Sequence, residues 1–176
     1  MSSKGTRKGF TLIELIIVLV ILGIIAAIAI PRLSSGSKNA GEASLRANLV
    51  TLRNAIDWYY GEHNMKFPAA TADGLGNPAG SSETLVNQLT MYSDAQGKCS
   101  ADKDPAFPYG PYIHGKFPKL PVGANAGTDT VSVNNMNTLL TANPTHGDGW
   151  VYSYTTGRII ANTNETGING KTYDTW

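Results

Sequence analysis

The chain begins with a polar, basic stretch that passes directly into an apolar run. Residues 10–30 read FTLIELIIVLVILGIIAAIAI, and no polar side chain occurs between Glu14 and Pro31. As a helix this run would be roughly 30 Å long, about the thickness of the hydrocarbon core of a bilayer. The pattern predicts a transmembrane helix over residues 10–32, ending at Arg32 and the polar residues that follow.

The charges that flank the apolar run predict its orientation. Lys4, Arg7 and Lys8 precede it with no acidic residue among them. By the positive-inside rule, the N-terminus stays in the cytoplasm and the chain beyond Arg32 is exported. A cleaved secretory signal and a plain membrane anchor are the simplest interpretations. The run is longer than the usual apolar core of a secretory signal, which disfavours the first of them.

A second helical pattern follows the apolar run. Pro31 is expected to kink or loosen the helix, because it removes one backbone hydrogen bond. Beyond it, large apolar residues recur at helical spacing and form one stripe: Leu45, Leu49, Leu52, Ile56 and Tyr59. The pattern predicts an amphipathic helix over residues 33–62, supported by i,i+4 charge pairs on its remaining surface and ending near Gly61. The expected pairs are Glu42–Arg46 and Arg53–Asp57.

Residues 63–176 are expected to form an exported globular head large enough for one small core. A short helix capped by Ser82 is predicted over residues 83–92, and a strand over residues 128–133. Residues 150–154 and 158–162 flank a turn of hairpin length, with Trp150, Tyr152 and Tyr154 alternating toward the core. The predicted fold is α+β: a long N-terminal helix packed on a small antiparallel sheet.

Composition and charge exclude several classes of protein. Fourteen basic residues against thirteen acidic ones give a formal charge of +1. The chain therefore lacks the large basic excess that is typical of nucleic-acid-binding proteins. The single cysteine, Cys99, excludes an intrachain disulfide. His63, His114 and His146 lie far apart in loop-like contexts and are expected at the surface. No catalytic or phosphate-binding motif occurs, so we expect no enzymatic activity.

Gly9 and Glu14 do not fit a plain membrane anchor. A carboxylate within the hydrocarbon region costs roughly 2.5–3.5 kcal/mol, so such a group is normally paired. No basic residue follows Glu14 within the span. Its partner is therefore expected at the cytoplasmic interface or on another molecule. Cleavage after Gly9 would create a new positive charge of the right kind, the amino group of Phe10.

The segment KGFTLIE, residues 8–14, with the apolar run behind it, resembles the class III leader and N-terminal helix of the type IV pilin superfamily. The resemblance implies that a prepilin peptidase removes residues 1–9 and that Phe10 is N-methylated. It implies that Glu14 neutralises the Phe10 amine of a neighbouring subunit during assembly. The implied partners are other copies of the chain, the prepilin peptidase/N-methyltransferase, the inner-membrane assembly platform, minor pilins or pseudopilins, and the lipid bilayer.

Two segments of the head, residues 110–123 and 147–162, resemble the major pseudopilin of type II secretion. Those relatives carry a calcium site near the end of the fold. In this chain the corresponding candidates are Asn164, Glu165 and Asp174, but the aspartate-rich pattern of the relatives is not reproduced. An ordinary Asn/Gly-rich loop is the favoured interpretation, and no cofactor is expected.

Two functional hypotheses remain open. The first is a structural subunit of the bacterial inner membrane that is processed and polymerises through its N-terminal helix. Its filament is either a periplasmic pseudopilus that drives type II secretion or a type IV pilus on the cell surface. The second is a membrane-anchored extracytoplasmic module that binds a ligand or acts in adhesion without polymerising. Gly9 and Glu14 favour the first, since an anchor requires neither.

Overall fold

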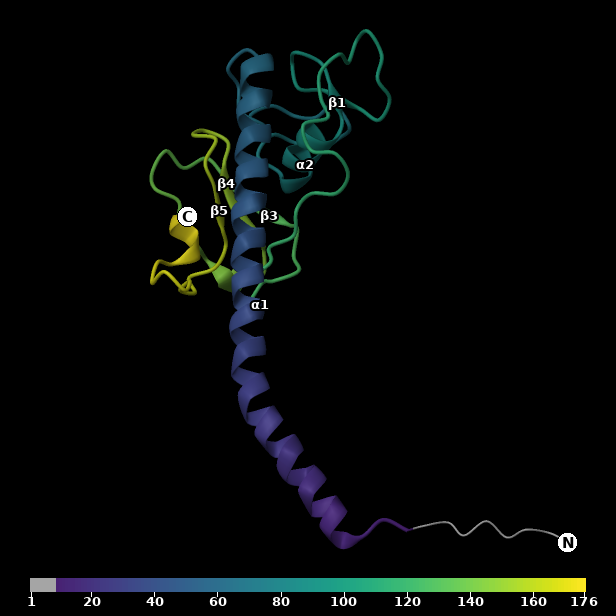
Figure 1. Cartoon of the computed structure of the whole chain (residues 1–176). Helices are drawn as coiled ribbons and strands as arrows, with labels where there is room; N and C mark the ends of the chain where they lie inside the picture. The colour runs from purple at the N-terminus through teal and green to yellow at the C-terminus, as the bar shows by residue number, and fades with distance from the viewer. Residues whose placement is uncertain (1–8) are drawn as a thin grey trace, which may run out of the picture. The chain divides into compact units, whose positions relative to one another are not determined.

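The computed structural model describes residues 9–176, except for the side chains of residues 29–35 (Figure 1). All of the predicted leader except Gly9 therefore lies outside the described residues. The chain divides into two units, with the boundary between Asn39 and Ala40. Helix α1, Leu12–Glu62, contributes residues to both units.

In the first unit, α1 begins after Thr11 and continues as helix through Pro31. Every described side chain from Phe10 to Ile28 is exposed. Among the helices that the structure describes, none is both long enough and apolar enough to cross a membrane. The predicted span covers residues 10–32. The side chains of its last four residues, 29–32, are not among those that the structure describes.

In the second unit, the last five turns of α1 form one wall of the hydrophobic core. The predicted stripe is confirmed, because each of its members is almost completely buried: Leu45, Leu49, Leu52, Ile56 and Tyr59. The end of the helix near Gly61 is also confirmed. Burying a stripe of this size favours folding by roughly 1.5–3 kcal/mol for each large side chain. The stripe therefore attaches α1 firmly to the rest of the head.

A short helix, α2 (Ser82–Thr90), follows a loop and leads into a small hairpin. Strands β1 (Tyr92–Ser93) and β2 (Cys99–Ser100) pair antiparallel. The predicted helix cap is wrong by one position, because Ser81 and not Ser82 has the extended backbone of an N-cap. The Ser81 hydroxyl accepts a hydrogen bond from the Thr84 amide at 3.2 Å.

The main sheet contains three strands in the order β3–β4–β5. Their bounds are β3 Val131–Asn134, β4 Trp150–Ser153 and β5 Ile159–Ala161. The β4–β5 hairpin is antiparallel, as predicted. The β3–β4 pair is parallel, so the prediction of an antiparallel sheet is wrong at this pairing. Residues 135–149 form a connection long enough for the chain to return to the same end of the sheet. The fold class, α+β with a long N-terminal helix, is confirmed.

The connection between β3 and β4 is held in place by Asn162, a buried side chain just beyond β5. Its amide nitrogen donates to the backbone carbonyls of Asn143 and Asp148, and its oxygen accepts from the Asn143 amide at 2.7 Å. The connection includes a short 3₁₀ helix, η1 (Pro144–His146). Because these bonds satisfy otherwise unpaired backbone groups, the long crossover is ordered without regular structure along most of its length.

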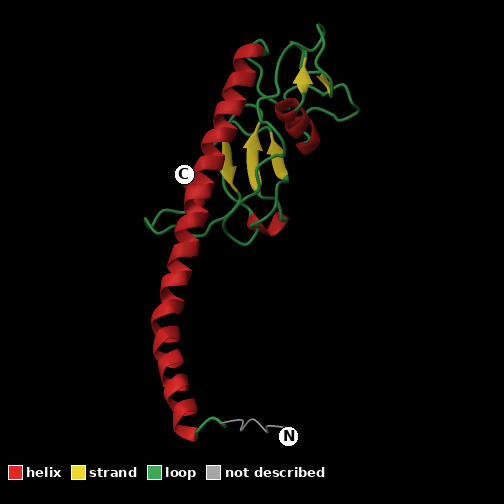
Figure 2. Cartoon of the chain, turned by 45° about the vertical axis from the view of Figure 1, so that its right-hand side comes forward, coloured by secondary structure: helices red, strands yellow, loops and turns green. Residues whose placement is uncertain are grey.

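The sheet has an inner and an outer face, since side chains alternate along each strand. Figure 2 shows the sheet beside the C-terminal part of α1. Trp150 and Tyr152 join the core that contains the α1 stripe, and both are fully buried. Val151 instead packs with Leu140 and Ile160 in a second, smaller cluster. The aromatic residues of β4 are therefore core residues, as predicted, with Tyr154 half-buried against them.

The β4–β5 turn depends on Gly157, whose φ of +69° is a conformation that favours glycine. A Cβ at this position would lie 2.3 Å from the ring of Phe67. The turn can therefore approach the loop that follows α1 only because position 157 has no side chain.

Candidate assembly and processing site

The predicted cleavage point lies immediately ahead of α1. Gly9 and Phe10 precede the helix, and the Phe10 side chain is 82% exposed. A peptidase needs an accessible backbone. Residues just ahead of the start of a helix have one, because their amides lie outside the helical hydrogen-bond ladder. Gly9 and Phe10 are both exposed in the single chain, and processing between them stays a prediction.

Thr11 and Glu14 form a reciprocal cap at the start of α1. The Thr11 amide and the Thr11 hydroxyl both donate to Glu14 Oε2 at 2.8 Å. In return, the Glu14 amide donates to the Thr11 hydroxyl at 3.3 Å. This is the capping-box arrangement of Thr-x-x-Glu, which satisfies the free amides of a helix N-terminus. The sequence TLIE carries that signal, but our sequence interpretation did not include it.

The cap gives Glu14 hydrogen-bond partners within its own chain but no partner of opposite charge. The expectation that its partner must come from the membrane interface or another molecule is wrong in part, because Thr11 of the same chain supplies two donors. Both donors are neutral, and both reach the same oxygen. Neither donor supplies a compensating positive charge, and both Thr11 bonds go to Oε2 and leave Oε1 without a bond from Thr11. A cation can still approach that oxygen.

The last residues of the chain are fastened to α1 by the buried carboxylate of Glu42. Its Oε1 accepts from the Ile168 amide at 2.7 Å and from the Tyr173 hydroxyl at 3.1 Å. The predicted pair with Arg46 is confirmed, with 3.5 Å between the guanidinium and Oε2. Arg46 also lies over the ring of Trp176 at 4.4 Å. Glu42 thus joins the first turn of α1 in the head to the short helix η2, Tyr173–Thr175.

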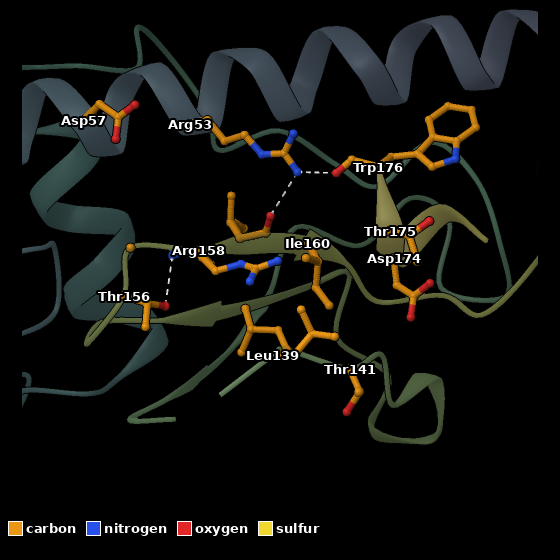
Figure 3. A pocket seen from close by; sticks show the side chains of 13 residues that line it. Arg53, Asp57, Leu139, Thr141, Thr156, Arg158, Ile160, Asp174, Thr175 and Trp176 are labelled. Carbon is orange, nitrogen blue, oxygen red and sulfur yellow. Dashed lines mark hydrogen bonds between the residues drawn. The ribbon is translucent and has the colours of Figure 1, made fainter. Parts of the chain in front are cut away.

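Arg53 makes a second connection between α1 and the residues at the end of the fold (Figure 3). Its guanidinium donates to the carbonyls of Ile159 and Trp176, so the predicted pair with Asp57 is not formed. Arg53 borders a cavity of about 640 Å³ between α1, β5 and η2, which Arg158 also lines. Burial and the charge of Arg158 lower the pKa of Arg53. The cavity contains no cysteine, serine or histidine that could act as a nucleophile or base.

The three calcium candidates do not form a carboxylate-rich site. Asn164 and Glu165 are exposed, while Oδ1 of Asp174 is buried without a hydrogen-bond partner among the described residues. Calcium takes six to eight oxygen ligands and usually several carboxylates. No group of three His, Cys, Asp or Glu side chains gathers within the described residues. The interpretation of this segment as an ordinary Asn/Gly-rich loop stays a prediction, and the segment is held by the protein contacts described above.

His63 is buried, so the expectation that all three histidines lie at the surface is wrong for this one; His114 and His146 are exposed. The His63 ring stacks on the Tyr59 ring, with 3.6 Å between the two ring centroids. Nδ1 lies 2.9 Å from the Tyr59 carbonyl and Nε2 lies 3.0 Å from the Ser93 hydroxyl. Because His63 follows Tyr59 by one helical turn, the apolar stripe extends one residue beyond the helix, and periodicity could have found it.

The burial of His63 predicts that the head loses stability in mild acid. Burial lowers the pKa of His63 below its ordinary value of 6.5, although Glu62 and Asp94 act in the opposite direction. Below about pH 6.5 the unfolded chain binds a proton at this position before the folded head does, so falling pH favours unfolding. The contribution is at most about 1.4 kcal/mol per pH unit. His63→Gln should flatten the dependence of the melting temperature on pH between 7.5 and 5.5.

The matched control is His146→Gln, because that side chain is exposed. It should keep the pH dependence of the parent. If His63→Gln and the parent lose the same number of degrees between the two pH values, His63 is not the titrating group.

Cys99 is buried, and its thiol donates weakly to the Gly97 carbonyl at 3.7 Å. Burial, together with the charges of Asp73 and Asp94, raises the pKa of this thiol to about 12. At neutral pH almost none of it is thiolate, the reactive form. Burial and the raised pKa both disfavour reaction of this thiol in the folded head.

Comparisons with known proteins agree with the N-terminal motif. Residues 4–30 match the family model described as the prokaryotic N-terminal methylation motif. The matched residues include Gly9, Phe10 and Glu14, the three positions singled out from the sequence.

The chain as a whole is similar to one group of secretion proteins. It is 32% identical over 138 residues to the type II secretion system core protein G of Aeromonas hydrophila, covering 72% of this chain and 90% of that protein. It is 36% identical over 119 residues to the core protein G of Klebsiella pneumoniae, covering 68% and 71%. A shorter match, 50% over 48 residues, relates it to the type IV narrow pilus major component PilA5 of Thermus thermophilus, covering 27% and 41%. No solved structure matches the chain.

Proposed function

Because this chain belongs to the family of the type II secretion system core protein G, the major pseudopilins, we propose that it builds the shaft of a secretion pseudopilus. It is a structural protein and not an enzyme. Membership implies processing by a prepilin peptidase and self-assembly into a filament. The single observation that carries the proposal is the combination of the methylation motif with similarity over 90% of a core protein G.

The apolar half of α1 supports a polymerising role. From Leu12 to Ile28, its large apolar side chains are exposed in the single chain, as is that of Phe10 ahead of the helix. An exposed apolar surface of this extent indicates a partner, either lipid or other protein. We propose that the bilayer of the inner membrane covers it first, with the N-terminus in the cytoplasm and the head in the periplasm. Neighbouring copies of the same helix cover it after assembly.

The processing step prepares the interaction that Glu14 makes in the filament. Removal of residues 1–9 between Gly9 and Phe10 would leave a charged amine on Phe10, close to the end of the helix that Glu14 caps. We propose that the Glu14 carboxylate of one subunit pairs with the charged Phe10 amine of its neighbour. The amine would donate to Glu14 Oε1, the oxygen that Thr11 does not contact. Further partners would be the N-methylating peptidase, the inner-membrane assembly platform and minor pseudopilins.

The proposed function is tested by recovering filaments. The full chain is overproduced in cells that carry the type II assembly machinery, the filaments are sheared from the cells, and the pelleted fraction is imaged by electron microscopy. The proposal requires filaments in which this chain is the major component. A chain that remains entirely in the membrane fraction would instead support the anchored ligand-binding or adhesion module.

A further inference from the structure

Strand β5 has a free backbone edge on the side away from β4. The Ser153 amide donates to the Arg158 carbonyl at 3.0 Å, at the start of the β4–β5 pairing. The Asn162 amide donates to the Gly149 carbonyl at 2.9 Å, at its other end. In an antiparallel pair, hydrogen-bonded positions alternate with positions whose amides and carbonyls point away from the partner strand. Ile159, next to Arg158, therefore turns its amide and carbonyl outward.

The outward groups of Ile159 lie at the cavity of about 640 Å³ between α1, β5 and η2, since Ile159 is one of the residues that line it. The Ile159 carbonyl accepts one hydrogen bond, from the Arg53 guanidinium at 3.4 Å, and a carbonyl can accept two. The Ile159 amide has no hydrogen-bond partner in the part of the chain that the structure describes. The cavity thus offers a backbone donor and a backbone acceptor that a ligand can pair.

Arg158 brings a positive charge to the same cavity (Figure 3). Its side chain is exposed, and among the described residues its guanidinium forms neither an ion pair nor a hydrogen bond. Arg53 also lines the cavity, and burial together with the charge of Arg158 lowers the pKa of Arg53. A guanidinium binds a carboxylate through two parallel hydrogen bonds. A carboxylate beside Arg158 would therefore relieve the repulsion between the two arginines.

Two acidic side chains line the cavity as well, and one of them shows what else a ligand must carry. Asp57 is exposed to solvent. Oδ1 of Asp174 is buried and accepts no hydrogen bond from any residue that the structure describes. A buried acceptor without a donor is unfavourable. The ligand therefore needs a hydrogen-bond donor in addition to a carboxylate, and a peptide supplies donors through its backbone amides.

We propose that this cavity binds an extended acidic segment of a partner protein by addition of a strand to β5. The backbone of the segment pairs with Ile159, one of its carboxylates lies on Arg158, and one of its amides donates to Asp174. Side chains alternate along a strand, so Arg158 and Ile160 lie on the same face of β5. An apolar residue two positions from the acidic one would then contact Ile160 and Leu139, which also line the cavity.

The two kinds of contact have different roles in such a complex. In strand addition, main-chain hydrogen bonds provide affinity and side-chain pockets provide the preference for a sequence. The segment should therefore be recognised by its extended backbone and by one acidic side chain. Inorganic anions, which lack a backbone, should bind weakly.

The first test measures the role of Arg158 by fluorescence anisotropy, with the full chain in detergent micelles. The probe is the labelled pentapeptide Thr-Glu-Thr-Val-Thr, acetylated and amidated at its ends, and the comparison peptide has Gln in place of Glu. Arg158→Gln should weaken binding of the Glu peptide at least about tenfold and leave binding of the Gln peptide unchanged. Lys103→Gln, which removes an exposed cation from another loop, is the matched control and should bind as the parent does.

Equal affinity of the parent and Arg158→Gln for the Glu peptide would overturn the proposal. Arg158 is exposed, so the variant should fold, and its melting temperature should match that of the parent. The measurement uses single chains and does not require filaments. Its outcome is therefore independent of the outcome for the proposed function.

The second test separates strand addition from the capture of any anion. Successive amides of an extended peptide point to opposite sides, so only one set can face β5. The Glu peptide is N-methylated either at residues 2 and 4 or at residues 3 and 5. One version should bind at least about tenfold more weakly, and the other should bind as the unmethylated peptide does.

Inorganic phosphate is the competitor in the same assay. It should displace the Glu peptide only at a large excess, because it cannot pair with the strand edge. Loss of affinity in neither methylated version would overturn strand addition. Displacement by phosphate at the concentration of the peptide would show that the cavity takes anions in general, and it would overturn the proposal as well.

Discussion

Glu14→Leu should leave the subunit inserted and processed but remove it from filaments. In a bundle of apolar helices, the Phe10 amine of a neighbour would lie in a medium of low dielectric constant. Removing one member of a buried ion pair leaves the other charge uncompensated, which costs about 3–5 kcal/mol. The filament fraction should therefore fall at least about a hundredfold relative to the membrane pool. The measurement is the ratio of subunit in sheared filaments to subunit in membranes, determined by quantitative immunoblotting.

The cap formed by Thr11 makes a sharper control necessary. Glutamine also caps a helix at this position, so Glu14→Gln keeps a donor–acceptor partner for Thr11 while removing the charge. If the charge is required, Glu14→Gln should fail as Glu14→Leu does. Glu14→Asp, with a shorter side chain, should give an intermediate yield. Thr11→Ala removes the two hydrogen bonds of the Thr11 hydroxyl and keeps both the amide bond and the Glu14 carboxylate, so it should retain most of the assembly. Normal filament yield from Glu14→Leu would contradict the pairing mechanism and favour the anchored module.

Leu52→Ala should markedly lower the stability of the head. Leu52 is 0% exposed and belongs to the core cluster that also contains Trp150 and Tyr152 of the sheet. Truncating a buried leucine costs about 2–5 kcal/mol through lost transfer energy and the cavity that remains. In a soluble fragment comprising residues 33–176, which we expect to fold alone, the melting temperature should fall by at least about 4 °C.

Val50→Ala is the matched control for this stability measurement. Val50 lies on the same helix but is 56% exposed, so its truncation should change the unfolding free energy by less than about 0.5 kcal/mol. A Leu52→Ala fragment that melts within one degree of the parent would show that the packing of α1 is assigned wrongly.

The periodic parts of this fold could be predicted from the sequence because local pattern and tertiary packing agree there. The Leu45–Tyr59 stripe and the β4–β5 hairpin both follow from the spacing of their apolar residues. The apolar periodicity of these segments is visible in the local sequence, whatever segment they pack against. The long helix and its end near Gly61 could be predicted for the same reason.

The parts that could not be predicted depend on contacts between distant segments. The parallel β3–β4 pair is set by a crossover that Asn162 holds, and no local pattern in β3 indicates its direction. Arg53 has an acidic residue one turn away, yet it donates to backbone oxygens of Ile159 in β5 and of Trp176. An exposed i,i+4 pair contributes little, so a tertiary partner readily replaces it.

The candidate site shows the same division. Glu14 stands out in the sequence because the cost of a carboxylate in an apolar run is a local property. Cleavage between Gly9 and Phe10 follows instead from the resemblance to the prepilin motif and stays a prediction. The Thr11 cap also follows from a local pattern, Thr-x-x-Glu, which lies at the start of the same apolar run. The burial of His63 follows from the stack on Tyr59, which extends the apolar face past the last helical residue.

The most direct test of processing and polymerisation together is the intact mass of the subunit extracted from sheared filaments. The expected mass is that of residues 10–176 plus one methyl group on the Phe10 amine, and fragmentation should place the methyl group on that residue. The full-length mass in filaments would contradict cleavage after Gly9, and so would a chain that begins beyond Ile30.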